Sequence, residues 1–186
     1  VYDWTFKVDM TKVDGKDINT KLNGAVFVLS EAKDLVLEPD KDGNPTKDQA
    51  SLIKLVDNHD GTYTIANTTT ATTYTMTTPI GGQISIKGLD DETKYYLYET
   101  KAPDGYNALT APVEIKITDN TYDIIGNQIV TQPDVVVNES NAYSGVGFNV
   151  ENNAGTTLPG TGGIGTTIFY VIGGGLMVAA AILLIT

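Results

Sequence analysis

The sequence predicts an all-β protein: an antiparallel β-sandwich, followed by a linker and one C-terminal transmembrane helix. Three observations carry this prediction. Thr, Val, Ile and Tyr recur in short runs typical of strands, turn-forming residues separate these runs, and no helical period precedes the last stretch of the chain. Short strands in such number pack as two antiparallel sheets, so we expect a sandwich.

Nine runs fit the strands of this sandwich. Clusters of Gly, Asn, Asp and Pro mark turns between them, for example at 57–61 and 103–105. Charged and turn-forming residues crowd 31–60 and 119–144, where we expect two insertions. The expected strands are 4–13, 25–30, 52–56, 62–66, 73–78, 83–87, 94–100, 113–118 and 146–152.

The composition argues against several classes of function. The chain carries 12 basic and 23 acidic residues, a net charge of −11, and every basic residue is Lys. An acidic surface without Arg is unsuited to nucleic acid, whose phosphates require a basic patch. There is no Cys, and we find neither a phosphate-binding loop nor a nucleophile–base pair. We therefore expect no enzyme activity and no cofactor.

Two polar features resemble functional sites only loosely. Glu38, Asp40 and Asp42 echo part of a calcium loop, but Gln49 stands where the loop would need Glu. We therefore expect a solvated turn and no metal. His59 is the only His and lies in a turn-like run, so we expect it at the surface.

The C-terminal stretch has the composition of a membrane span. Residues 164–185 are apolar or small, and a helix of about 20 such residues crosses a bilayer. We divide the chain into a sandwich domain (1–153), a linker (154–163) and a transmembrane segment (164–186). Neither a signal peptide at the start nor a basic cluster after the span is present, so we expect a longer precursor.

A five-residue motif stands directly before this span. Leu158-Pro159-Gly160-Thr161-Gly162, followed by a hydrophobic segment, resembles the LPXTG sorting signal of Gram-positive surface proteins. Pro restricts the backbone and Gly permits a close approach, which suits entry into a narrow groove. The resemblance implies that a sortase cuts between Thr161 and Gly162, while the span holds the substrate at the membrane only transiently.

Three strands that face the core each end in a polar residue. Because side chains alternate along a strand, Lys12 shares the inward face of Met10. Glu99 shares that of Leu97, and Asn152 continues the inward face of the last strand. An unpaired buried charge is costly, so we expect these three polar side chains to meet.

Several segments around these residues identify a family resemblance. Residues 96–106 (Tyr-Leu-Tyr-Glu-Thr-Lys-Ala-Pro-Asp-Gly-Tyr) resemble the E-box of sortase-assembled pilins and of the B-type domains of collagen adhesins. Residues 12–15 and 22–29 resemble the first two strands of that family, and 148–152 its last. The resemblance implies an immunoglobulin-like sandwich of the collagen-adhesin B type. It also implies an intramolecular isopeptide bond between Lys12 and Asn152, assisted by Glu99.

The residue types suit that chemistry. Burial favours a neutral, nucleophilic Lys12 and a protonated Glu99, which can polarise the amide of Asn152 and shuttle protons. The alternative is a Lys–Glu ion pair with an uninvolved Asn. Lys7, Asn149 and Asn153 are also near, but alternation points them outward.

We expect a structural pilin subunit in the pilus at the cell wall of a Gram-positive bacterium, and a shaft subunit is the leading interpretation. Its expected partners are a sortase, neighbouring pilin subunits and peptidoglycan. The alternatives are an ancillary pilin or wall-anchored adhesin that binds host matrix proteins, and a wall-anchored enzyme with its catalytic domain upstream. A shaft subunit needs an acceptor Lys in a pilin motif, which we do not find in residues 1–186.

Overall fold

The computed structural model describes residues 5–66, 69–91, 93–118, 124–125, 128–129, 133–139, 141–143 and 147–155. The expected sortase motif and the expected span over 164–186 lie outside these ranges. Inside them, no helix has the length and apolar character needed to cross a membrane. The all-β prediction is confirmed there, since the regular structure consists of strands and one short 3-10 helix, η1 (Gln49–Ser51).

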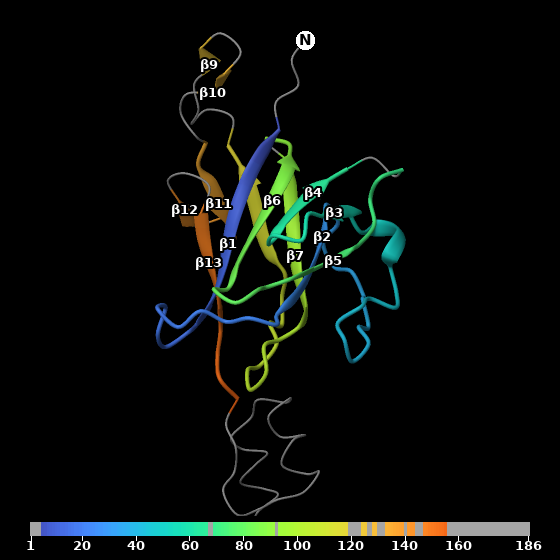
Figure 1. Ribbon diagram of the computed structural model, residues 1–186, viewed down its shortest axis with the longest axis vertical. Coiled ribbons are helices and arrows are strands. Elements are labelled where there is room, and N and C mark those ends of the chain that lie inside the picture. Colours follow the sequence, from blue (N-terminus) through green and yellow to red (C-terminus); the bar gives the residue numbers. More distant parts are fainter. Residues whose placement is uncertain are drawn as a thin grey trace, which may run out of the picture.

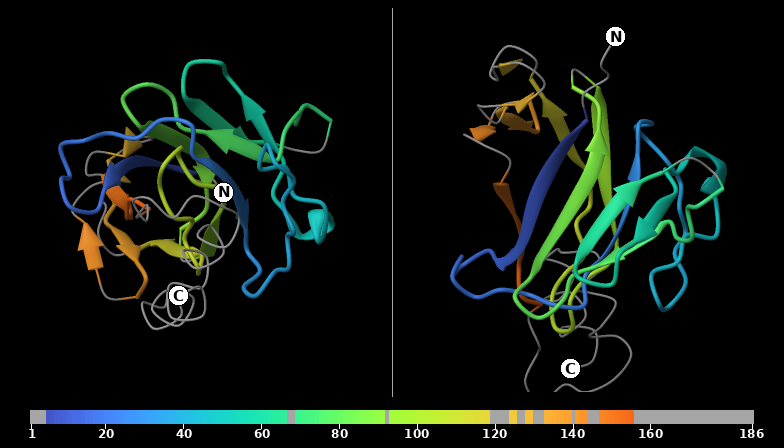
Figure 2. Two further views of the ribbon diagram at one scale, coloured as in Figure 1. Left: turned by 90° about the horizontal axis from the view of Figure 1, so that it is seen from below. Right: turned by 45° about the horizontal axis from the view of Figure 1, so that its top comes forward.

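Two sheets face each other as a sandwich and enclose the main core (Figures 1 and 2). The first sheet, in the order β13–β1–β6–β4–β3, contains β1 (Phe6–Asp14), β3 (Leu55–Asp57), β4 (Thr62–Ile65), β6 (Gln83–Leu89) and β13 (Gly147–Asn152). The second, in the order β12–β11–β8–β7–β2–β5, contains β2 (Val26–Ser30), β5 (Thr75–Thr77), β7 (Lys94–Lys101), β8 (Val113–Ile117), β11 (Val135–Val137) and β12 (Asn141–Tyr143). β9 (Ile124–Ile125) and β10 (Gln128–Ile129) pair with each other.

The prediction of a purely antiparallel sandwich is wrong for the first sheet. β1 and β13 pair in parallel, with Lys12 opposite Val150, and β4 and β6 also pair in parallel. Parallel neighbours need a long crossover connection. β1 and β13 are joined by the whole domain between them, and the chain from β4 visits the second sheet as β5 before it returns as β6. The first and last strands of the sandwich therefore lie side by side and run in the same direction.

All nine expected strands have counterparts, β1 to β8 and β13, but 119–144 is more than an insertion. Within it, β11 pairs antiparallel with β8 and extends the second sheet. Val135 and Val137 contribute to the core and are at most 5% exposed. A strand of three residues has too few alternations to be recognised from sequence.

The expected alternation along β1 is confirmed. Phe6, Val8 and Met10 are buried in the main core, where removal of apolar surface from water supplies the main stabilisation. The second sheet is also covered on its outer side. There, a smaller apolar cluster forms between the sheet and the excursion that contains η1; its buried members are Val28, Leu37, Leu52, Tyr96 and Tyr98. This cover explains why all five residues of β2 are buried.

Candidate functional site

Lys12 is a fully buried lysine near the end of β1. Its side chain has no exposed surface, and its Nζ donates a hydrogen bond to the main-chain oxygen of Val150 over 2.9 Å. Burial lowers the pKa of Lys12 to about 8, although the negative charges of Glu99 and Glu151 act in the opposite direction. A lysine with this pKa reaches the neutral, nucleophilic form at pH values where an exposed lysine stays charged.

Glu99 faces Lys12 from the opposite sheet. Its side chain is also fully buried, and its Oε1 lies 3.9 Å from the Nζ of Lys12. Its Oε2 accepts hydrogen bonds from the main-chain nitrogen of Leu109 over 2.8 Å and from the Nδ2 of Asn152 over 2.9 Å. Burial raises the pKa of Glu99 above its ordinary value, against these hydrogen bonds and the nearby Lys12. The environment thus favours a carboxyl group that can hold a proton.

Asn152 ends β13 and is 1% exposed. Its Nδ2 donates to Glu99 and to the main-chain oxygen of Asn107, the latter over 2.6 Å. These two contacts fix the orientation of the amide. The Oδ1 of Asn152 is buried without a hydrogen-bond partner, as is the Oε1 of Glu99. Unsatisfied buried polar atoms are rare and call for an explanation.

The structure therefore brings together the three residues that strand alternation predicted. Lys12 and Asn152 come from neighbouring parallel strands, and Glu99 contacts both of them from β7. A buried amine with a lowered pKa, a buried carboxyl group with a raised pKa and an oriented amide can together carry out acyl transfer to nitrogen.

The neighbouring residues that alternation excluded do lie outside the site. The side chain of Lys7 is 46% exposed and pairs with Asp9 over 3.3 Å. Asn149 and Asn153 are exposed.

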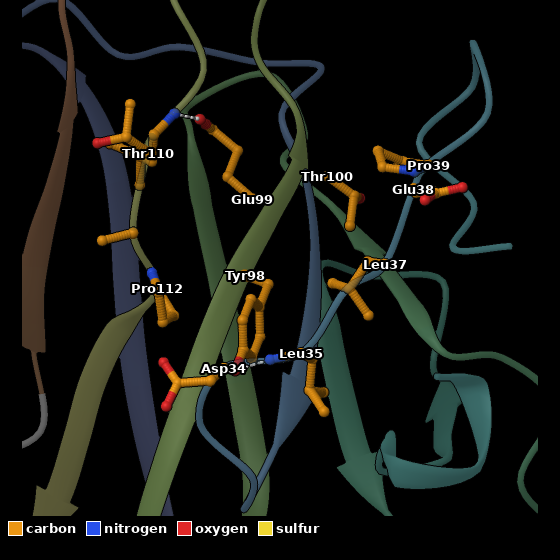
Figure 3. A pocket seen from close by; sticks show the side chains of 12 residues that line it. Asp34, Leu35, Leu37, Glu38, Pro39, Tyr98, Glu99, Thr100, Thr110 and Pro112 are labelled. Atoms are coloured by element: carbon orange, nitrogen blue, oxygen red, sulfur yellow. Dashed lines mark hydrogen bonds between the residues drawn. The ribbon is translucent and has the colours of Figure 1, made fainter. Parts of the chain in front are cut away.

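The sequence did not indicate the loop that completes the site. Asn107 and Leu109 hold Asn152 and Glu99 through main-chain atoms, which carry no side-chain signature. The same loop borders a cavity of about 320 Å³ between residues 34–39 and 109–112. Figure 3 shows Glu99 at the edge of this cavity, with its carboxyl group directed at the main chain next to Thr110. The only signal was the position of this loop directly after the E-box-like segment.

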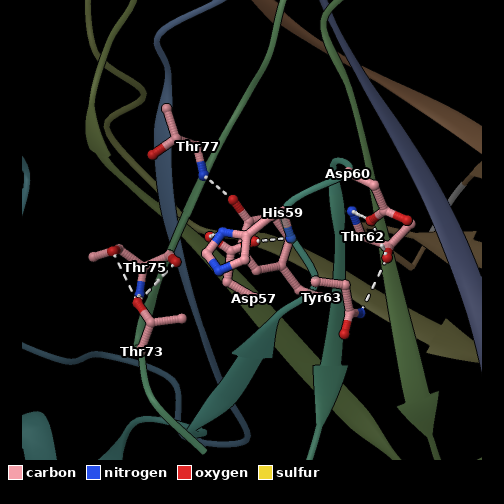
Figure 4. A network of polar contacts seen from close by, with 9 residues as sticks. Asp57, His59, Asp60, Thr62, Tyr63, Thr73, Thr75 and Thr77 are labelled. Atoms are coloured by element: carbon pink, nitrogen blue, oxygen red, sulfur yellow. Dashed lines mark hydrogen bonds and ion pairs between the residues drawn. The ribbon is translucent and has the colours of Figure 1, made fainter.

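The two weaker polar features are surface turns. The carboxyl group of Asp40 accepts hydrogen bonds from Asn44 and from the main chain of the same turn. No cluster of His, Asp or Glu in the described parts of the chain could hold a metal ion. The side chain of His59 is 87% exposed, as expected, in the polar turn between β3 and β4 (Figure 4).

Comparison with known proteins shows that the chain is similar to pilins. Residues 6–129 match the family model described as SpaA, prealbumin-like fold domain. The fimbrial subunit type 1 of Actinomyces viscosus is 31% identical over 189 residues, which cover 93% of this chain and 30% of that protein. The chain thus spans less than a third of the length of this curated relative.

Solved structures of pilins are also similar. The backbone protein of pilus 2b of group B streptococcus is 27% identical, with a TM-score of 0.45, over 81% of this chain and 41% of that one. A streptococcal ancillary pilin is 22% identical, with a TM-score of 0.42, over 82% and 30%. The shaft pilin SpaA of Lactobacillus rhamnosus GG is 18% identical, with a TM-score of 0.46, over 84% and 50%.

Proposed function

This chain belongs to the SpaA family of prealbumin-like fold domains, and we propose that it is part of a structural pilin subunit stabilised by an isopeptide bond between Lys12 and Asn152. The observation that carries the proposal is the meeting of Lys12, Glu99 and Asn152 inside the sandwich. Burial of three polar side chains costs free energy, which hydrogen bonds or a covalent bond must offset. We further propose that a sortase polymerises the subunit and anchors it to the wall through Leu158–Gly162.

The bond would form in one acyl transfer within the folded domain. The neutral amine of Lys12 attacks the Cγ of Asn152, a new C–N bond forms, and the former amide nitrogen leaves as ammonia. The proton lost by the amine goes to the leaving nitrogen through Glu99. The reaction needs no oxidant, metal or cofactor, because all atoms of the amide and the ammonia come from the two side chains.

Glu99 has two roles in this scheme. Its raised pKa lets it carry a proton near the amide, which stabilises negative charge as it develops on the Oδ1. Glu99 passes this proton to the leaving nitrogen, which its Oε2 already contacts, and its carboxylate form then accepts the proton that the amine loses. Preorganisation inside the core replaces a bimolecular encounter.

The sorting step would join this subunit to a second amine. The sortase Cys attacks the carbonyl of Thr161, the bond to Gly162 breaks, and the thiol proton leaves with the new amino terminus of Gly162. An amine of a neighbouring subunit or of peptidoglycan then replaces the sulfur. This places the subunit in a pilus on the cell wall of a Gram-positive bacterium, after transient membrane attachment through 164–186.

Intact-mass spectrometry of the folded protein tests the bond directly. We expect a mass lower by one ammonia than the sequence requires, and one cross-linked peptide containing Lys12 and Asn152 after proteolysis. Lys12→Ala and Asn152→Ala should each restore the full mass, whereas Lys7→Ala on the same strand should keep the deficit. A full mass for the folded parent protein would refute the proposed bond.

A denaturing gel of cell-wall extract tests the role in the pilus. Covalent polymerisation predicts a ladder of high-mass species that contain this chain, and Thr161→Ala should remove it. A single band released from the wall would instead identify a monomeric adhesin or ancillary subunit.

A further inference from the structure

The chain leaves the sandwich through a clamp of main-chain hydrogen bonds. The nitrogen of Asn107 donates to the oxygen of Asn153 over 2.9 Å, and the nitrogen of Gly155 donates to the oxygen of Gly105 over 2.8 Å. On the other side, the nitrogen of Gly15 donates to the oxygen of Asn152 over 2.8 Å. Residues 152–155 are therefore held between two loops as far as Gly155.

This clamp belongs to one end of the sandwich, which we call the stem pole. It consists of the loop 14–24, the turn 78–82 and the loop 102–107, and all three surround the point where β13 ends (Figure 1). Hydrogen bonds tie these segments together: Tyr106 donates to Asp14 over 2.8 Å, and the nitrogen of Gly24 donates to the oxygen of Thr78 over 2.9 Å. The stem pole is thus a connected surface.

The clamp limits how far the sortase motif can stand from this surface. An extended chain advances by at most about 3.6 Å per residue, so Leu158 lies within about 11 Å of Gly155 and Thr161 within about 22 Å. The limit holds for any conformation of the intervening residues. An enzyme that binds Leu158–Gly162 in a groove is therefore held close to the stem pole during the reaction.

The stem pole presents two exposed aliphatic side chains. Ile80 is 93% exposed and Ile18 is 53% exposed. Ile80 sits on an ordered turn, in which the nitrogen of Gly82 donates to the oxygen of Pro79 and the oxygen of Gly82 accepts from the nitrogen of Lys12. A single exposed Ile is ordinary, but this one is held on an ordered turn of the stem pole, the end of the sandwich from which the sortase motif follows.

We propose that the stem pole, including Ile80, is a second recognition surface for the sortase that cuts between Thr161 and Gly162. The proposal rests on the proposed sorting function. The motif supplies the reacting carbonyl, and the stem pole supplies contact area that a free peptide lacks. The sortase would thereby favour folded subunits, since the clamp exists only when β13 and the loop 102–107 are in place.

Cleavage kinetics test this proposal. The full chain in detergent micelles is treated with purified sortase of the host bacterium, with hydroxylamine as the acceptor, and release of the fragment from Gly162 onward is followed by mass spectrometry. Ile80→Ser should lower kcat/KM roughly five-fold, as expected for an apolar side chain that is buried in an interface. Val36→Ser is the matched control, because Val36 is 57% exposed but lies outside the stem pole. It should leave kcat/KM unchanged.

Two further substrates sharpen the test. A synthetic peptide of residues 156–164 should be cut with a lower kcat/KM than the full chain. This peptide gives the kcat/KM of the motif without the stem pole. Insertion of about twelve Gly and Ser residues after Gly155 should lower the kcat/KM of the full chain toward that of the peptide. The reason is that the longer linker lowers the effective concentration of the stem pole near the bound motif. Faster cleavage after the insertion would show that the stem pole obstructs the sortase and would overturn the proposal.

The outcomes separate this proposal from the one on which it rests. Cleavage of parent and Ile80→Ser chains at equal rates would overturn the recognition surface alone. No cleavage at Thr161 in the parent chain would overturn both proposals. The ammonia deficit of Ile80→Ser, measured on the same sample, shows whether that variant has folded.

Discussion

The Nζ of Lys12 lies 2.9 Å from the main-chain oxygen of Val150, two residues before Asn152 on the neighbouring parallel strand. This hydrogen bond holds the amine against β13, the strand that ends in Asn152. The pairing of β1 and β13 thus places Lys12 and Asn152 on adjacent strands, two register positions apart.

Loss of the proposed bond should lower stability strongly. The bond closes a loop of about 140 residues, and a cross-link of that length stabilises a fold by about 5 kcal/mol through the entropy of the unfolded chain. We expect Asn152→Ala to lower the free energy of unfolding in urea by about this amount. Asn149→Ala, on the exposed side of the same strand, should change it by less than about 0.5 kcal/mol. Equal effects of the two substitutions would argue against a covalent link.

Glu99 should set the rate of bond formation. General acid–base groups contribute about 10²- to 10⁴-fold to a reaction, so Glu99→Gln should slow the loss of ammonia by a factor in this range. The substitution preserves shape and can still accept from Leu109. The measurement is intact mass against time after refolding. Glu114→Gln, which affects a surface ion pair with Lys94, should leave the rate unchanged, and an unchanged rate for Glu99→Gln would remove its catalytic role.

The Asn152→Ala variant should become more stable as pH rises from 8. It cannot form the bond, so Lys12 stays titratable, with a pKa of about 8 when folded and 10.5 in the unfolded chain. Between about pH 8 and pH 10.5 the unfolded chain binds more protons than the folded chain, and the free energy of unfolding therefore rises with pH. From pH 7.5 to 9.5 we expect a gain of about 2 kcal/mol in urea denaturation.

Glu99 acts in the opposite direction at lower pH. Its folded pKa is raised above 4.5, so the stability it contributes is present at acidic pH and is lost as pH rises through the raised value.

The double variant Asn152→Ala/Lys12→Met is the control for the prediction about Lys12 at alkaline pH, because other groups titrate alike in both proteins. An equal gain between pH 7.5 and 9.5 in the two variants would show that Lys12 is not the group responsible.

Two adjacent glycines should respond differently to substitution. Both have positive φ, +97° at Gly81 and +73° at Gly82. An added Cβ at Gly81 meets nothing within 4 Å, whereas at Gly82 it would lie 2.7 Å from the main-chain oxygen of Lys12. Gly81→Ala should cost about 1 kcal/mol and Gly82→Ala about 3 kcal/mol, measured by thermal and urea unfolding. Gly82→Ala should also slow ammonia loss, because it displaces the backbone that carries Lys12; equal costs would contradict this packing.

The side chains of the candidate site could be predicted from the sequence because alternation is a local property. Met10 is buried and Lys12 follows on the same face, and the same reasoning reaches Glu99 and Asn152. The loop that orients them could not be predicted. Asn107 and Leu109 act through main-chain atoms, which every residue possesses.

Strand existence was also more predictable than strand pairing. β1 and β13 each show clear alternation, yet nothing within either strand indicates that they are parallel neighbours, because pairing across the whole domain depends on the path between them. β11 was missed because its three residues supply too little pattern. The cover over Tyr96 and Tyr98 was expected only as an insertion, since its packing depends on tertiary contacts.

The parallel course of β1 and β13 determines how the domain would respond to a pull. With Lys12 and Asn152 joined, a pull between the start of β1 and the end of β13 passes through those two residues alone. The roughly 140 residues between them form a side loop that cannot be drawn out, although fully extended they would add about 480 Å. Each subunit would then be an almost inextensible link, in which the hydrogen bonds of the sheets maintain shape and the covalent bond sets length.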